Sequence, residues 1–352
     1  MRGKSAWFDK RKVQYEIIHA MKAIQVNKRG GDFELVNKAI PNPNENEILI
    51  KVQVCGVCHG DAVTKEGYFP DMVYPKVPGH EVIGIVSKLG GNTQRWQVGQ
   101  RVGVGWHGGH CNKCAACLKG NFLGCENSLT TGISTHGGYA EYMVARSEAV
   151  VSIPDELNSA EAAPLLCAGR TTFGALLNSG ARGGDLVAIH GLGGLGHLAV
   201  QYAVKLGFKT IVISHSTEKE ALAYQLGAHA FINSTTADPA KELKRFGGAK
   251  AIISLAPDAK MISHLVSGLC LDGQIIVVTA VNEPIQLNSN LLFSGASIKG
   301  FAGGNIEDTM QFSMLTKVVP TVEVFPLEQA ATAYEKMMSS KVHFRAVLKI
   351  SD

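Results

Sequence analysis

Thiols gather in one short stretch of this sequence, "GHCNKCAACLKGNFLGC", which runs from Gly109 to Cys125. Half of the eight cysteines of the chain lie in it, with the spacing C-x2-C-x2-C-x7-C: Cys111, Cys114, Cys117 and Cys125. Four thiolates can hold one tetrahedral zinc with no open position, and such a site would be structural, not catalytic. An iron–sulfur cluster, a disulfide cluster and a DNA-binding finger use the same residue type. The spacing by itself leaves these alternatives open.

Three further residues of metal-binding type lie far apart in the sequence. The segments "CGVCHGD", "PGHEVIG" and "LLCAGRTTF" contain Cys58, His80 and Cys167. Zinc binds thiolate and imidazole, and a catalytic zinc keeps one position open for water or substrate. The three residues could supply such a site, but their spacing does not show that they meet. Each one alone is more typical of a buried thiol or a core histidine, and Cys55 and Cys270 have no assigned role beyond burial.

A glycine-rich segment, "IHGLGGLGHLAVQ", has the pattern G-x-G-x-x-G at Gly191, Gly193 and Gly196. It follows an apolar run typical of a strand and begins a helical pattern, which is the context that a dinucleotide-binding loop requires. The first glycine permits the tight turn, the second lets the backbone approach a pyrophosphate, and the third allows close packing of helix on strand. A plain glycine-rich loop is the alternative. The predicted phosphate-binding residues are Gly191, Leu192, Gly193, Gly194, Leu195 and Gly196.

The end of the next predicted strand indicates which nucleotide binds. NAD enzymes usually place Asp or Glu there, roughly 20 residues after the glycines, to bind the ribose 2′-hydroxyl. Here "TIVISHSTEKEAL" has Ser214, His215 and Ser216 at that place and no acid before Glu218. The three side chains can donate to a 2′-phosphate, and Lys219 adds positive charge. We therefore predict NADP in preference to NAD, although Lys219 and its neighbours could also be a solvated helix start.

Two kinds of element pattern must position these residues, and the length of 352 residues suits two domains. Up to about residue 151 the chain consists of short strand-like runs separated by Gly and Pro, such as 47–56, 80–90 and 98–105, which predicts a β-rich domain. From residue 159 onward a predicted helix over 159–178, with Ser159 as N-cap, precedes alternating strands and helices. This alternation predicts a parallel sheet with helical crossovers. The tail ends in a strand at 344–350.

Composition excludes several classes of protein. No apolar run reaches the ~18 residues of a membrane span, and a net charge of +4 makes no case for nucleic acid or a membrane surface. Residues 1–20 form a basic extension without the apolar segment of a secretory signal, and we predict that they are disordered or vector-derived. A cytoplasmic location follows as an expectation, in which thiols stay reduced and cysteines serve as metal ligands or buried thiols.

The combination of these motifs resembles the zinc-dependent medium-chain alcohol dehydrogenases. The shared motifs stand in the order of that family: "CGVCHGD", "GHE", the four-cysteine run, "CAG-x-TT" and "GLGGLGH". The likeness is strongest to the NADP-preferring branch that includes cinnamyl alcohol dehydrogenases. The resemblance implies an α/β protein with a GroES-like β-rich catalytic domain (21–165 and 305–352) and a Rossmann nucleotide-binding domain with a doubly wound parallel sheet (166–304). It also favours zinc over an iron–sulfur cluster at the four cysteines.

The resemblance also implies roles for single residues. Cys58, His80 and Cys167 would hold a catalytic zinc, Glu81 would be an alternative ligand, and Asp61 would orient the ligand histidine. Further matches are Thr171 beside the nicotinamide, His59 and Arg345 near the cofactor phosphates, and Phe69 and Trp106 in the substrate pocket. The implied reaction is reversible hydride transfer between NAD(P)H and an aldehyde or ketone, in a homodimer or homotetramer that acts on small molecules.

The sequence departs from the family pattern at two positions. The family's proton-relay residues are replaced by Gly60 and Val63, which cannot transfer a proton, so the expectation is a water chain or a contribution from His59. Gly60 is also expected to leave more room beside the metal for a bulky substrate. The alternatives are a zinc-free quinone oxidoreductase-like reductase and, more remotely, a zinc-binding nucleic-acid regulator, for which the four-cysteine segment offers only Lys113 and Lys119 as basic residues.

Overall fold

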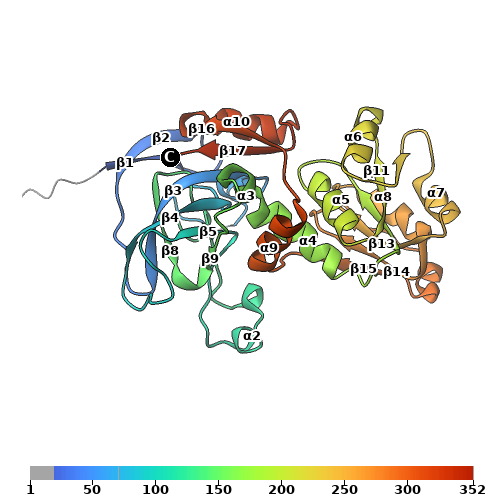
Figure 1. The fold of residues 1–352 in the computed structure, drawn as a ribbon, viewed down its shortest axis with the longest axis horizontal. Helices are drawn as coiled ribbons and strands as arrows, with labels where there is room; N and C mark the ends of the chain where they lie inside the picture. The colour runs from blue at the N-terminus through green and yellow to red at the C-terminus, as the bar shows by residue number, and fades with distance from the viewer. Residues whose placement is uncertain (1–19, 70, 352) are drawn as a thin grey trace, which may run out of the picture.

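A computed structural model describes residues 20–69 and 71–351, so the predicted N-terminal extension lies outside the described residues except for Ala20. The chain forms two lobes, one rich in strands and one in which strands alternate with helices (Figure 1). The last helices and strands return to the first lobe, so both chain ends of the described part belong to it.

The first lobe is built around a seven-stranded sheet in which β3 (Glu47–Val57) pairs with β17, β4 and β8. The order along the sheet is β16-β17-β3-β4-β5-β9, and only the β16–β17 pair is parallel. Two smaller sheets, β1-β2 and β6-β7, complete the lobe. Its strands are β1 (Ala20–Val26), β2 (Phe33–Ala39), β4 (Val82–Leu89), β5 (Arg101–Val104), β6 (His107–Gly109), β7 (Leu129–Thr130), β8 (Tyr142–Arg146), β9 (Val150–Ser152), β16 (Val322–Pro326) and β17 (Arg345–Lys349).

Alternation along β3 explains how this lobe obtains its core. Ile48, Ile50 and Val52 are fully buried, whereas Lys51 between them is exposed, because successive side chains of a strand point to opposite faces. Helix α10 (Ala330–Met338) covers the same core with Tyr334 and Met337. The remaining helical segments of the lobe are α1 (Asp61–Glu66), α2 (Ala115–Leu118), η1 (Phe122–Gly124), η2 (Ser147–Ala149) and η7 (Leu327–Gln329).

The second lobe contains a parallel six-stranded sheet in the order β12-β11-β10-β13-β14-β15. The predicted strands are present, and two that were not predicted, β12 and β15, form its edges. Because helices lie against both faces, the central strands are buried along their whole length, as parallel sheets require. The strands are β10 (Leu186–His190), β11 (Lys209–Ser214), β12 (Ala230–Asn233), β13 (Ala249–Ser254), β14 (Leu269–Val277) and β15 (Ser297–Gly300).

The predicted crossover helices are present, but α7 (Pro239–Arg245) was not predicted and one predicted helix ends early. The predicted helix over 259–270 ends as a helix at Leu265, passes through η5, and gives its last two residues to β14. Helix α5 begins directly after the glycine-rich loop. The helical segments of this lobe are α5 (Gly196–Lys205), η4 (Thr217–Lys219), α6 (Glu220–Gln225), α7 (Pro239–Arg245), α8 (Ala259–Leu265), η5 (Val266–Gly268) and η6 (Ser289–Ser294).

The helical segment after residue 158 joins the lobes and corrects one prediction. Its N-cap is Asn158, whose side chain accepts from the amides of Ala160 and Glu161, so Ser159 is the first helical residue and not the cap. The predicted single helix is α3 (Ser159–Pro164) and α4 (Arg170–Leu177) with a π-helical turn, Leu165–Gly169, between them. Such turns often occur at functional sites, and this one contains Cys167.

The two lobes share one apolar core. A cluster of buried residues extends from Val54, Ile83 and Val347 of the first lobe to the sheet and helices of the second. Helix α9 (Ile306–Thr316) lies between the lobes beside α4 (Figure 1). There Tyr202 of α5 forms a buried hydrogen bond of 2.7 Å with Ser313 of α9. Among the described residues, none of the helices combines the length and apolar character that a membrane crossing requires.

Candidate active site

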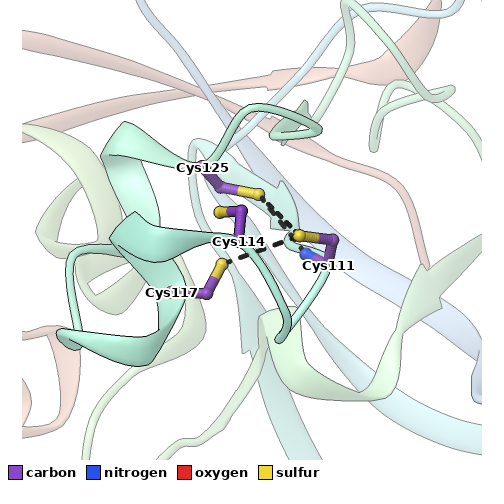
Figure 2. Close-up of side chains that lie close together, drawn as sticks. All are labelled: Cys111, Cys114, Cys117 and Cys125. Carbon is purple, nitrogen blue, oxygen red and sulfur yellow. Dashed lines mark hydrogen bonds between the residues drawn. The ribbon is translucent and has the colours of Figure 1, made fainter.

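The four cysteines of the segment 111–125 converge on one point (Figure 2). The Sγ atom of Cys111 lies 3.5 Å from that of Cys125 and 4.0 Å from that of Cys117. A disulfide needs about 2.05 Å between sulfurs, and all eight cysteines are free thiols. Four sulfurs around a zinc at about 2.3 Å would stand about 3.8 Å apart. The geometry therefore fits a closed four-thiolate metal site.

The backbone around this cluster stabilises thiolates. Amides of Lys113 and Cys114 lower the pKa of Cys111 to about 6, and the amides of Cys111 and Asn127 point at the sulfur of Cys125. The segment contributes little core of its own, since large apolar side chains are exposed on it: Leu118, Phe122 and Leu123. A metal that links the four thiolates would therefore replace the core that this loop lacks.

The second donor set brings together residues that the sequence placed far apart. One ligand atom from each of Cys58, His80, Glu81 and Cys167 lies within 4.8 Å of the others. The sulfurs of Cys58 and Cys167 are 3.8 Å apart. The hydrogen bond between these two thiols lowers the pKa of Cys58 well below its ordinary value and raises that of Cys167. The pair therefore readily holds one negative charge, which suits a cation.

The imidazole of His80 provides the direct test of whether a metal fits here. Its Nδ1 lies 3.2 Å from a carboxylate oxygen of Asp61, and a proton shared there leaves the lone pair of Nε2 for a metal. That Nε2 atom is buried and has no hydrogen-bond partner among the described residues. A buried acceptor without a partner costs about 1–3 kcal/mol. A zinc bound by Cys58, His80 and Cys167 would remove this cost.

Asp61 lies behind the donor set as the first residue of α1. Its carboxylate is buried and accepts from the amides of Cys58 (2.9 Å) and Gly79 (3.2 Å), from Nδ1 of His80 and from the hydroxyl of Tyr139 (2.9 Å). Tyr139 was not among the predicted site residues, because nothing in the sequence around this loop tyrosine indicates a contact with Asp61. The carboxylate thus fixes both the backbone of one ligand and the ring of another.

Glu81 is fully buried and forms an ion pair with Arg345, with 2.5 Å between Oε1 and Nη2. Burial raises the pKa of Glu81 to about 7, although Arg345 acts in the opposite direction. Its other oxygen, Oε2, has no partner in the described part of the chain. Arg345, the first residue of β17, is itself buried. The pair places one free carboxylate oxygen beside the thiols, where it could serve as a further ligand.

The space beside the metal site is smaller than expected. The prediction that Gly60 leaves more room is wrong, because the ring of Trp106 lies edge-on against that of His80, with 4.8 Å between centroids. A Cβ atom at Gly60 would stand 2.7 Å from Cε1 of His80 and 2.7 Å from Cζ3 of Trp106. Glycine is therefore required by packing here. Trp106 reaches the metal site, whereas the side chains of Phe69 and His59 are exposed to solvent.

The glycine-rich loop has the expected turn geometry. Gly191 has φ of +101°, a conformation that favours glycine. A Cβ at Gly196 would collide with the carbonyl oxygen of Gly191, whereas Gly193 faces open space. A Cβ at Gly194 would lie 3.3 Å from Nη1 of Arg345. The arginine that pairs with Glu81 therefore also reaches the loop.

His197, inside the "GLGGLGH" motif, has a structural role that the sequence did not reveal. It is fully buried, its Nδ1 lies 3.3 Å from the carbonyl of Gly193, and its Nε2 accepts from the amide of Thr321. Its ring stacks on Phe344 at 4.6 Å. Burial lowers the pKa of His197 to about 3, so the ring is neutral. It ties the loop to the segment that leads into β17.

The other predicted cofactor residues lie at two places. Ser214 is buried at the end of β11, His215 is exposed, and Ser216 and Lys219 are half-buried around η4. Thr171 is half-buried on α4, one turn after Cys167.

Two cysteines were predicted to have no role beyond burial. Cys55 is buried as expected, but Cys270 is only half-buried.

The chain has two lobes, two donor sets that contain cysteines, and a loop of the dinucleotide-binding type. These features define a dehydrogenase that binds zinc and a nicotinamide nucleotide, and comparison with known proteins agrees. Residues 44–155 match the alcohol dehydrogenase GroES-like domain, and residues 194–318 match the zinc-binding dehydrogenase domain. Alcohol dehydrogenase notN of Aspergillus sp. (strain MF297-2) is 42% identical over 309 residues, 87% of this chain and 91% of that protein. Alcohol dehydrogenase patD of Penicillium expansum is 42% identical over 325 residues, 91% and 95% of the two chains.

A solved cinnamyl alcohol dehydrogenase of Sorghum bicolor has a TM-score of 0.84 at 29% identity, over 94% of this chain and 98% of that one. The chain therefore belongs to the zinc-binding medium-chain alcohol dehydrogenase family. It is an NAD(P)-dependent oxidoreductase that interconverts alcohols with aldehydes or ketones. The predicted fold class, a GroES-like lobe plus a Rossmann lobe, is confirmed.

The Asp61→Asn variant tests the positioning of the ligands. In this variant an amide NH2 group would face N–H and O–H donors whose hydrogen bonds the carboxylate now accepts. We therefore expect zinc at His80 to be bound more weakly and kcat/KM for aldehyde reduction to fall about 10- to 100-fold. Zinc per chain and steady-state rates measure the two effects. Asp155→Asn, at an exposed aspartate, is the control. Unchanged zinc content and activity in Asp61→Asn would contradict this role.

The Cys114→Ala variant tests the four-cysteine site. We expect it to lose one zinc per chain and about 5 °C or more in Tm, because the loop loses its link. Zinc content and thermal unfolding are measured beside Cys270→Ala, a half-buried cysteine outside both donor sets. If Cys114→Ala keeps both the zinc and the Tm of the unmodified protein, the site is not structural.

The Gly60→Ser variant tests the packing beside the metal site. Its Cβ would displace the rings of His80 and Trp106, so we expect aldehyde reduction to fall about tenfold or more, since overpacking costs about 1–3 kcal/mol. Gly183→Ser, at an exposed position where a Cβ would meet no atom closer than 3.9 Å, is the control. Rates equal to those of the unmodified enzyme would show that the site has room for a side chain at this position.

Proposed function

We propose that this enzyme binds two zinc ions per chain, prefers NADP, and reduces small aldehydes or ketones in the reverse of alcohol oxidation. Cys58, His80 and Cys167 would hold the catalytic zinc, with Glu81 as an alternative ligand. The four cysteines of segment 111–125 would hold the structural zinc. The observation that carries the proposal is the buried, unpartnered Nε2 of His80, which lies among two thiols and a free carboxylate oxygen.

When bound, the zinc supplies polarisation of the carbonyl or alcohol oxygen and the nicotinamide supplies or accepts the hydride. The chain's own residues prepare the site. Asp61 holds the ring of His80 in one tautomer, and Arg345 balances the charge of Glu81. Trp106 covers the open side of His80 and helps to exclude water. Thr171, one helical turn after Cys167, is placed to contact the nicotinamide.

The proton that the alcohol loses on oxidation must reach solvent without the relay side chains that are usual in this family. Gly60 and Val63 have no group that transfers a proton, and the tight packing at Gly60 leaves no space there for a substitute side chain. The exposed ring of His59, next to Cys58, faces solvent. We propose that His59, directly or through water, exchanges the proton with bulk solvent.

The nucleotide would bind across the loop from Gly191 to Gly196. Arg345 and His59 would contact its phosphates, and the positive end of α5 adds to that attraction. Ser214, His215, Ser216 and Lys219 would bind the 2′-phosphate of NADP. Support comes from the end of β11, where no carboxylate stands to repel the phosphate.

We also propose that the chain divides into a catalytic domain, residues 21–165 with 305–352, and a nucleotide-binding domain, residues 166–304. The strands on either side of these boundaries belong to different sheets.

Chains would associate as dimers or tetramers through the edge strand β15, near which Leu271 and Phe293 are 72% and 90% exposed. Phe69 and Trp106 would line the substrate pocket. Free thiols at all eight cysteines are consistent with the cytoplasm. The zinc-free reductase alternative is not favoured, since both donor sets are assembled.

The proposal is tested with a panel of alcohols and aldehydes, each assayed with NADP(H) and with NAD(H). The rate is measured from the change in absorbance of the reduced nicotinamide. Zinc per chain is measured on the same protein. Turnover with NADPH at a higher kcat/KM than with NADH, and two zinc per chain, would support the proposal. Metal-independent turnover would instead favour the quinone oxidoreductase-like alternative.

Ser214→Asp is expected to shift the preference toward NAD. A carboxylate at the end of β11 would repel the 2′-phosphate and accept from the 2′-hydroxyl of NAD. We expect the ratio of kcat/KM for NADPH to that for NADH to fall by about tenfold or more, equivalent to about 1.4 kcal/mol. Ser214→Asn, of equal size without charge, is the control. An equal change in both variants would exclude the charge as the cause.

A further inference from the structure

One buried cation in this structure has no counter-ion. Arg170, the first residue of α4, is 8% exposed. Its Nε is fully buried without a hydrogen-bond partner, and its guanidinium forms no hydrogen bond or ion pair with any described residue. A buried charge is costly unless it is paired, and arginine is the residue best suited to bind a planar anion. The exposed face of this guanidinium therefore needs a partner.

A cavity of about 400 Å³ lies at this side chain. Its walls come from the four-cysteine loop, from η2 and β9, and from the start of α9. Its lining mixes apolar and polar residues in nearly equal numbers, which suits a carbon skeleton with one polar end. The charged or titratable residues of its lining are Arg95, His107, Glu148, Arg170 and Glu307.

The two acids in the cavity wall are already paired with other arginines. Glu148 accepts from Nε of Arg146 at 3.0 Å, and Glu307 from Nη2 of Arg95 at 3.0 Å. Burial lowers the pKa of His107, and Arg170 adds to that effect, so His107 is neutral. The cavity thus contains one uncompensated positive charge, on Arg170.

Several residues of the cavity wall are close neighbours in the sequence of residues at the metal donor set. Arg170 follows Cys167 by three residues, at the point where the π-helical turn leads into α4. His107 directly follows Trp106, whose ring contacts His80. In addition, a Cβ at Gly105 would touch Ile306 of the cavity wall. A short ligand could therefore have one end at Arg170 and the other near the metal donors.

We propose that Arg170 binds a carboxylate of the substrate, so that the enzyme prefers alcohols or aldehydes with an acidic group at the far end of a short carbon skeleton. This inference rests on the proposed alcohol dehydrogenase function. A carboxylate fits better than a phosphate, because its single negative charge and planar shape match the one unpaired guanidinium of Arg170. Arg170 can form two parallel hydrogen bonds to a carboxylate.

The test compares 4-formylbenzoate with its methyl ester, which has the same skeleton without the charge. The measured quantity is the ratio of kcat/KM for the acid to kcat/KM for the ester. We expect Arg170→Met to lower this ratio about 10- to 100-fold, the range for losing a charged hydrogen bond, and Arg170→Lys to retain part of it. Arg245→Met removes an equal charge from the exposed surface of α7 and should leave the ratio unchanged.

A second measurement uses the unmodified enzyme and so does not depend on how the variants fold. Benzoate should inhibit reduction of the neutral ester at least about tenfold more strongly than benzamide. Equal inhibition by the two, or an unchanged substrate ratio in Arg170→Met, would overturn the inference while leaving dehydrogenase activity intact. No reduction of either aldehyde would instead overturn the proposed function on which it rests.

Discussion

The carboxylate of Asp61 is the constraint on which the catalytic half of this protein depends. It is 1% exposed and accepts hydrogen bonds from Cys58, Gly79, His80 and Tyr139. A buried carboxylate is tolerated only when its lone pairs are satisfied, so the four donors must meet around it. Three separate segments of chain are thereby held in one arrangement, and two of the metal donors are fixed with them.

A second buried charge pair connects this centre to the nucleotide lobe. Glu81, next to His80, pairs with Arg345 at the start of β17, and Arg345 also reaches the glycine-rich loop at Gly194. His197 contacts the same loop at the carbonyl of Gly193 and stacks on Phe344, the residue before Arg345. Charges that must be paired away from water therefore link the metal site to the nucleotide loop, where a hydride would pass between substrate and cofactor.

Packing limits the room around the metal more than the pattern of residue types indicated. The expectation of extra space at Gly60 failed because Trp106 lies against His80 and takes that space. Likewise Ser159 was expected as the helix cap, but the neighbouring Asn158 has the side chain in position to accept two amides. Strands β12 and β15 were missed because both are edge strands of four residues with a weak apolar pattern.

The sequence by itself determined what depends on local spacing. The cysteine run between Cys111 and Cys125, the turn that begins at Gly191 and the alternation of strands and helices all act over a few residues, so their patterns predict their geometry. Only the tertiary structure decided what depends on contacts across the chain. The meeting of Cys58 with Cys167, the pairing of Glu81 with Arg345 and the isolation of Arg170 arise because the two lobes share one core, and no local pattern encodes that distance.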